Sequence, residues 1–122
     1  MANLDALIRR LNVFDAFGGI GGARTAIDRA GIQVGKHWSS EIDPVAAAIA
    51  RKNYPDMIAL GDIRQVHGVD EPVDLFCAGF PCQDLSRGNV KGQGLGGARS
   101  GLGYEIPRLL DTLQPEHVLV EN

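Results

Sequence analysis

The chain has 122 residues, of which 44% are hydrophobic and 22% charged, and its formal net charge is −3. This length allows one domain, and the composition is that of a globular protein with a real core. The negative charge argues against a generally basic surface, so any nucleic-acid contact must be local or supplied elsewhere. No apolar stretch approaches the roughly 20 residues that span a bilayer, and a signal-peptide pattern is lacking, so we expect a cytoplasmic protein with no membrane partner.

Short apolar runs alternate with helical stretches, which is typical of a parallel α/β sheet. Strands are expected at 11–17, 35–41, 57–60, 73–78 and 118–120. Helices are expected at 23–30, closed by Gly31, from Pro44 to Tyr54 with Asp43 as cap, and at 104–113. Apolar residues at helical spacing also predict a short packing helix before the first strand: Leu4, Leu7, Ile8 and Leu11.

The carboxyl ends of the expected strands carry most of the chemically notable residues. In an open α/β sheet, ligands bind beyond these ends, near the point where the strand order reverses. The residues at such ends are Gly18 to Gly22, Glu41, Asp62, Cys82 and Glu121. This edge of the sheet is therefore the predicted ligand site.

A glycine-rich turn, Phe17-Gly18-Gly19-Ile20-Gly21-Gly22, follows the first strand. Such a turn lets backbone approach a nucleotide-like cofactor, although this one lacks the Gly-x-Gly-x-x-Gly spacing and a tight turn without a ligand is the alternative. Glu41 ends the second strand, where an acid can bind the two ribose hydroxyls, or where a solvated surface acid can lie. Asp62 could accept from an adenine amino group, with Ile42 and Ile63 against the ring.

Cys82 is the candidate nucleophile. It lies past the fourth strand, next to Pro81 and ahead of a glycine-rich segment that is locally positive. Nearby positive charge lowers the pKa of a thiol, whereas a structural Pro-Cys turn is the alternative. Cys77, within the strand, is expected to be buried, and the two cysteines form neither a Cys-x-x-Cys pair nor a zinc knuckle, so no metal site is expected. No motif makes a histidine the base for Cys82, and all three are interpreted as structural or solvated: His37, His67 and His117.

From Val13 to Asn122 the chain resembles the amino-terminal half of the cytosine-5 DNA methyltransferases. Residues 15–22 resemble the family's first cofactor motif, and 41–43 and 61–63 its second and third. Residues 79–83 resemble the catalytic motif, 98–102 the end of the catalytic loop, and Glu121-Asn122 the start of the Glu-Asn-Val motif. These pieces occur in the family's order and at its spacing.

The resemblance implies a Rossmann-like, S-adenosylmethionine-dependent methyltransferase fold with a mostly parallel sheet of about five strands in the order 3-2-1-4-5. Cys82 would add to C6 of a cytosine flipped out of the duplex, and Glu121 would hold N3 and the exocyclic amine. S-adenosylmethionine would be the cofactor and S-adenosylhomocysteine the product. The implied cofactor-binding residues are Phe17, Gly18, Gly19, Ile20, Gly21, Gly22, Glu41, Ile42, Asp62, Ile63, Pro81 and Leu102. The implied DNA-contacting and catalytic-loop residues are Gln83, Ser86, Arg87, Lys91 and Arg99.

The chain also departs from the family pattern. Ile42 stands where some members have an aromatic residue, which predicts weaker adenine stacking. The Gln-x-Arg-x-Arg motif, the target-recognition domain and the final helix are not in this sequence, so residues 1–122 are interpreted as a partial catalytic domain. We expect it to be a fragment or one subunit of a bacterial or phage modification enzyme, inactive until the complementary half is present.

Three other functions are alternatives to DNA methylation for this sequence. A branch of the same family methylates a tRNA cytosine. A subunit that binds S-adenosylmethionine without catalysing transfer is the second, and a cysteine hydrolase, which would need a partner histidine, is the third.

Overall fold

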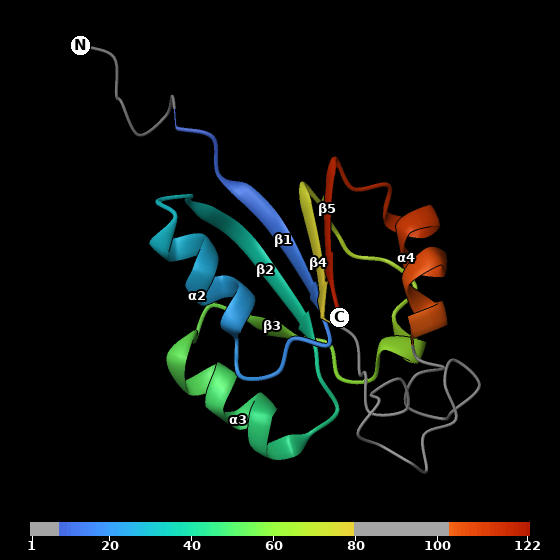
Figure 1. Cartoon of the computed structure of the whole chain (residues 1–122), viewed down its shortest axis with the longest axis horizontal. Coiled ribbons are helices and arrows are strands. Elements are labelled where there is room, and N and C mark those ends of the chain that lie inside the picture. Colours follow the sequence, from blue (N-terminus) through green and yellow to red (C-terminus); the bar gives the residue numbers. More distant parts are fainter. Residues whose placement is uncertain (1–7, 80–102) are drawn as a thin grey trace.

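The computed structural model describes residues 8–79 and 103–122. In chain order its elements are β1 (Leu11–Ala16), α2 (Gly22–Arg29), β2 (Val34–Ser40), α3 (Pro44–Asn53), β3 (Ile58–Ala59), the 3-10 helix η1 (Ile63–Gln65), β4 (Leu75–Gly79), α4 (Glu105–Leu113) and β5 (His117–Glu121). The strands form one parallel sheet in the order β3-β2-β1-β4-β5, as predicted. Helices α2 and α3 lie on one face of the sheet and α4 on the other (Figure 1).

The central strand β1 is buried on both faces, which explains why its sequence is almost continuously apolar. Val13 packs with Ile27 of α2, whereas Phe14 packs with Leu109 of α4. The Phe14 ring also stacks on Phe76 of β4, with ring centroids 5.5 Å apart. This alternation along β1 fixes which side chains face each helical layer.

The expected strands are confirmed, with ends that shift by one to two residues. β3 is shorter than expected because it pairs with β2 only at Trp38–Ile58 and Ser39–Ala59. β1 ends one residue early because Phe17 has a φ of 58°, which no strand residue adopts. β2 ends at Ser40, so Glu41 lies just beyond the strand.

The three helices expected after β1 are confirmed as well. Asp43 caps α3, because its carboxylate accepts hydrogen bonds from the N–H groups of Val45 and Ala46. Gly31 follows α2 with a φ of 78°, the left-handed conformation expected of a residue that closes a helix.

The helix expected before β1 lies mostly outside the described residues. Where the structure does describe it, Ile8 to Arg10 are not helical and Leu11 already belongs to β1. This part of the prediction is wrong, because Leu11 is paired with Val34 of the sheet. Within 8–79 and 103–122, no helix has both the length and the hydropathy needed to cross a membrane.

The parallel register brings distant segments to one edge. The glycine turn follows β1, Glu41 follows β2, Asp62 follows β3, and Glu121 ends β5. Figure 1 shows the ends of β1, β2, β4 and β5 close together, with the C-terminus beside them. The predicted ligand edge therefore exists as a structural feature.

Candidate cofactor site and active site

The glycine turn has a backbone that ordinary side chains do not fit. Gly19 and Gly21 have φ values of 57° and 94°, in the left-handed region. A Cβ on Gly18 would lie 2.1 Å from the Ser39 Oγ atom, so a side chain there is excluded. Gly18 N–H donates to the Ser40 carbonyl at 3.0 Å, which ties the turn to the end of β2.

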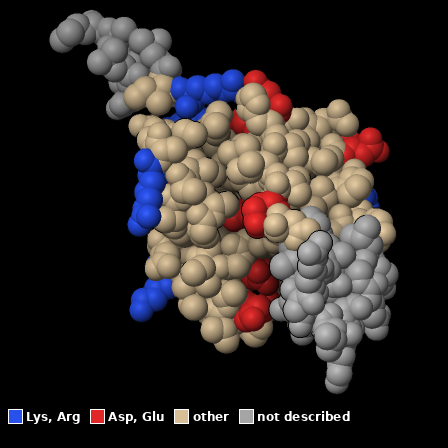
Figure 2. All heavy atoms as spheres, viewed as in Figure 1, with Lys and Arg blue, Asp and Glu red and all other residues tan. Residues whose placement is uncertain are grey.

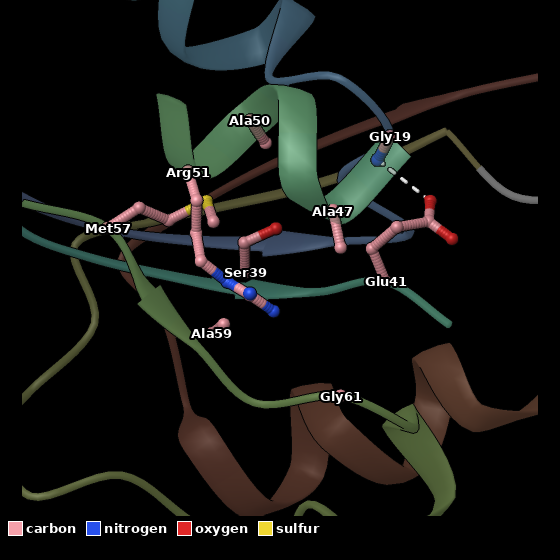
Figure 3. A pocket seen from close by; sticks show the side chains of 9 residues that line it. All are labelled: Gly19, Ser39, Glu41, Ala47, Ala50, Arg51, Met57, Ala59 and Gly61. Carbon is pink, nitrogen blue, oxygen red and sulfur yellow. Dashed lines mark hydrogen bonds between the residues drawn. The ribbon is translucent and has the colours of Figure 1, made fainter. Parts of the chain in front are cut away.

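The Glu41 carboxylate is held by backbone donors on two sides. Its Oε1 accepts from the Gly19 N–H at 2.9 Å, and its Oε2 accepts from the Asp43 N–H at 2.9 Å. Figure 3 shows the first of these bonds, across the space between the glycine turn and β2. A carboxylate has about four acceptor positions, so each oxygen keeps a lone pair for a ligand hydroxyl.

A small pocket lies beneath Glu41, between α3 and the β2–β3 edge (Figure 3). Its volume is about 30 Å³, and its wall includes Ser39, Ala47 and Met57. Small-molecule sites are typically of the order of several hundred Å³, so a nucleoside does not fit inside it. A cofactor held by Glu41 must therefore lie over the strand ends.

Asp62 caps η1 rather than projecting freely. Its Oδ1 accepts from the Arg64 N–H at 2.9 Å, and its Oδ2 accepts from Arg64 Nη2 at 2.6 Å. These bonds lower the pKa of Asp62 and keep it ionised as an acceptor. The two isoleucines predicted to contact an adenine ring differ in exposure: the side chain of Ile42 is 61% exposed, whereas that of Ile63 is only 2% exposed. Ile42 therefore offers apolar surface at the edge, whereas Ile63 packs in the core.

A larger pocket of about 280 Å³ opens at the ends of β1, β4 and β5. It is lined by Asp15, Phe17, Gly18, Gly22, Ala23, Cys77, Ala78, Gly79, Leu119 and Glu121. The β4–β5 register sets Glu121 opposite Gly79, the residue that leads into Pro81-Cys82. Glu121 thus lies beside the strand end from which the candidate nucleophile follows.

Asp15 is a buried acid in this pocket wall, and the sequence alone predicted no separate role for it. It is 3% exposed, and its Oδ2 atom has no hydrogen-bond partner. Burial, reinforced by the charge of Glu41, raises the pKa of Asp15 to about 7. An acid inside an apolar strand was the signal that could have found it.

His37 lies next to Asp15 on the same face of the sheet. Its Nε2 is 4.0 Å from Asp15 Oδ2, and its Nδ1 is 3.2 Å from Arg24 Nη1. Because an arginine can only donate, Nδ1 is the acceptor and the proton is on Nε2, directed at Asp15. Burial, with the charge of Arg24 adding to it, lowers the pKa of His37 to about 4, so this histidine is neutral. The interpretation of His37 as structural is confirmed.

Cys77 is buried, as expected, and burial raises the pKa of its thiol to about 11. It is therefore inert at neutral pH. The remaining predicted site residues lie outside the described residues, and their roles stay predictions: Pro81, Cys82, Gln83, Ser86, Arg87, Lys91, Arg99 and Leu102. Ile20 is described and lies exposed on the turn.

The order β3-β2-β1-β4-β5 with a glycine turn after the central strand defines a Rossmann-like fold. The crystal structure of S. pombe Dnmt2 methyltransferase shares it with a TM-score of 0.64, at 22% identity, covering 91% of this chain and 33% of that one. The model of the C-5 cytosine-specific DNA methylase family matches residues 11–122. The chain belongs to this family.

Curated relatives agree with the family. The chain is 37% identical over 111 residues to the Type II methyltransferase M.NlaX of Neisseria lactamica, covering 90% of this chain and 35% of that protein. It is 34% identical over 119 residues to the Type II methyltransferase M2.BsuMI of Bacillus subtilis (strain 168), covering 92% and 29%. The chain thus spans about a third of the length of these relatives.

Proposed function

We propose that this chain supplies the cofactor-binding and nucleophile-bearing part of an S-adenosylmethionine-dependent enzyme that methylates C5 of cytosine in DNA. The family match supports the reaction class. The observation that carries the assignment of residues is the register of β4 with β5, which sets Glu121 beside the strand that leads to Cys82. In the proposed reaction, this acid and the Cys82 thiol act on two different atoms of one pyrimidine ring.

The cofactor edge fits an adenosyl ligand in three respects. Glu41 presents oriented acceptors for the ribose hydroxyls. The turn at Gly18 leaves no room for a side chain, so backbone lines the approach. Glu121 places a carboxyl group in the adjacent pocket, where a positively charged ligand group is favoured over an anion. Bound there, S-adenosylmethionine supplies the methyl group.

The residues of this chain prepare the cytosine. C5 is a poor nucleophile, so the Cys82 thiolate adds to C6 and the displaced π electrons enrich C5. Glu121 holds N3 and the exocyclic amine and stabilises the charge that develops as the C–S bond forms. After C5 has gained the methyl group, loss of the C5 proton drives out Cys82 and restores the ring. Because C6 is hidden in a stacked duplex, the base must first be flipped out.

The test is transfer of a labelled methyl group from S-adenosylmethionine to duplex DNA or to tRNA. The chain is assayed alone and fused to the remaining part of M.NlaX, since it spans only 35% of that relative. We expect the fusion to label duplex DNA and the chain alone to give no turnover. Cys82→Ala should reduce labelling by at least about a thousandfold, as expected for loss of a nucleophile. Cys77→Ala should leave labelling unchanged.

Two results would count against this proposal. Labelling of tRNA in preference to DNA would favour the RNA branch of the family. Full activity of the Cys82→Ala fusion would remove the covalent step and leave a cofactor-binding role for the chain.

A further inference from the structure

Arg108 of α4 makes two contacts to a distant part of the chain and one within its own helix. Its Nη1 donates to the Val66 carbonyl at 2.7 Å and its Nη2 to the Ile63 carbonyl at 2.9 Å, across 42 and 45 residues of sequence. Its Nε donates to Glu105, one turn earlier on α4. The guanidinium fork therefore connects α4 to both ends of the η1 segment.

The two carbonyls belong to a short segment with few hydrogen bonds of its own. η1 is only three residues long, and the Ile63 carbonyl accepts one backbone bond within the segment, from the Val66 N–H at 3.1 Å, whereas Val66 lies just past the end of η1. The side chains of Ile63 and Val66 are 2% and 5% exposed and lie in the core with Ile106 and Leu109 of α4. Packing thus holds the side chains of this segment against α4, while Arg108 holds its backbone.

Asp62 is the N-cap of η1 and immediately precedes it. Its carboxylate accepts from the backbone N–H of Arg64, so the position of the carboxylate follows the position of η1. We propose that Arg108 is a positioning residue that fixes η1 against α4 and thereby sets Asp62 for the adenine end of the cofactor. This inference rests on the proposed function, which makes Asp62 a cofactor contact.

A phosphate contact would be a simpler role for Arg108, because a guanidinium binds phosphate well. Its three hydrogen bonds use donors on all three guanidinium nitrogens, and the side chain is only 35% exposed. A lysine in its place has one ammonium on a flexible stem and cannot match the fork. The geometry therefore favours a role in connecting α4 to η1. Arg108→Lys keeps the positive charge but removes the guanidinium fork, so it tests which of the two matters.

Arg9 provides a matched control. Its guanidinium also bonds two acceptors, on Asp74 and Glu116, but these lie at the opposite, amino-terminal edge of the sheet. Arg9→Met removes an arginine and its ion pairs without touching η1.

The experiment compares the full wild-type chain with Arg108→Met, Arg108→Lys and Arg9→Met by backbone hydrogen exchange and by calorimetric titration with S-adenosylhomocysteine. In Arg108→Met the amides of Arg64, Gln65 and Val66 should exchange about tenfold faster relative to those of β1, and the dissociation constant should rise about tenfold. Arg108→Lys should show both changes at reduced size. Arg9→Met should leave the η1 exchange and the dissociation constant within about twofold of wild type.

The readouts separate the two proposals. Unchanged η1 exchange in Arg108→Met would overturn the positioning role, whether or not ligand binds. Faster exchange with unchanged affinity would reduce Arg108 to a structural contact. Failure of the wild-type chain to bind S-adenosylhomocysteine would contradict the proposed function, and the exchange data would then still decide whether Arg108 holds η1.

Discussion

Asp15 and His37 place two ionisable groups inside the α2 face of the sheet, and neither has a hydrogen-bond partner for the atom that faces the other. Burial raises the pKa of Asp15 to about 7 and lowers that of His37 to about 4, from ordinary values of 3.8 and 6.5. Between about pH 4 and 6.5 the folded pair therefore holds one proton. The unfolded pair also holds one, on the histidine, so the effects of the two groups on stability oppose each other.

This cancellation predicts opposite pH dependences for two single variants. In Asp15→Asn only His37 remains, and the unfolded chain binds its proton more readily, so stability should rise with pH between 4.5 and 6.5 more steeply than in wild type. In His37→Gln only Asp15 remains, and stability should fall with pH relative to wild type. In each variant, the slope of the free energy of unfolding against pH should differ from that of wild type by no more than about 1.4 kcal/mol per pH unit.

Urea unfolding at three pH values across this window measures these slopes. Comparing each variant with wild type removes the contributions of the other titrating groups. Parallel stability curves for wild type and Asp15→Asn would show that the pair does not titrate as the burial of both side chains implies.

Among the secondary-structure elements, α3 helps to position Glu41, because the N-cap residue of this helix contacts the Glu41 carboxylate. Asp43 caps the helix with its carboxylate and donates its own N–H to Glu41. The cap therefore lies between the helix and the proposed ribose contact. The sequence alone predicts this helix start, because an Asp precedes a Pro and a run of alanines follows.

Removing the cap should destabilise the fold without moving Glu41, because the Asp43 N–H is a backbone group. Asp43→Ala is expected to lower the free energy of unfolding by about 1 kcal/mol. Asp111→Ala, at the end of α4 where an acid opposes the helix dipole, should cost less than about 0.5 kcal/mol. Equal losses in chemical denaturation would show that the carboxylate of Asp43 is no cap in solution.

Strand ends and glycine turns are local patterns, and they predicted the edge that carries Glu41 and Glu121, whereas the order of the strands was implied by the family resemblance. The sequence did not reveal the role of Arg108, whose acceptors are backbone carbonyls more than 40 residues away. Backbone acceptors carry no residue-type signal. The Asp15–His37 pair was missed for a related reason, since the alternation of β1 and β2 shows that both face one layer only once their register is known.

At the scale of the whole molecule, charge is distributed unevenly. Figure 2 shows acidic side chains near the end of β5 and near the start of α3, whereas Lys and Arg lie over the far ends of α2 and α3. An acidic carboxyl edge suits a cationic cofactor and disfavours phosphate. Under the proposed function, DNA contacts would come from the cations of residues 86–103 and from parts that the longer relatives possess.

The proposed binding of an adenosyl ligand by Glu41 at the carboxyl edge can be measured by calorimetric titration of the chain with S-adenosylhomocysteine. Glu71→Ala, an acid at the opposite edge of the sheet, is the control. We predict that wild type and Glu71→Ala bind equally and that Glu41→Ala binds about 10- to 100-fold more weakly, the loss expected for hydrogen bonds to a carboxylate. Equal affinity of Glu41→Ala and wild type, or no binding by wild type, would contradict the account.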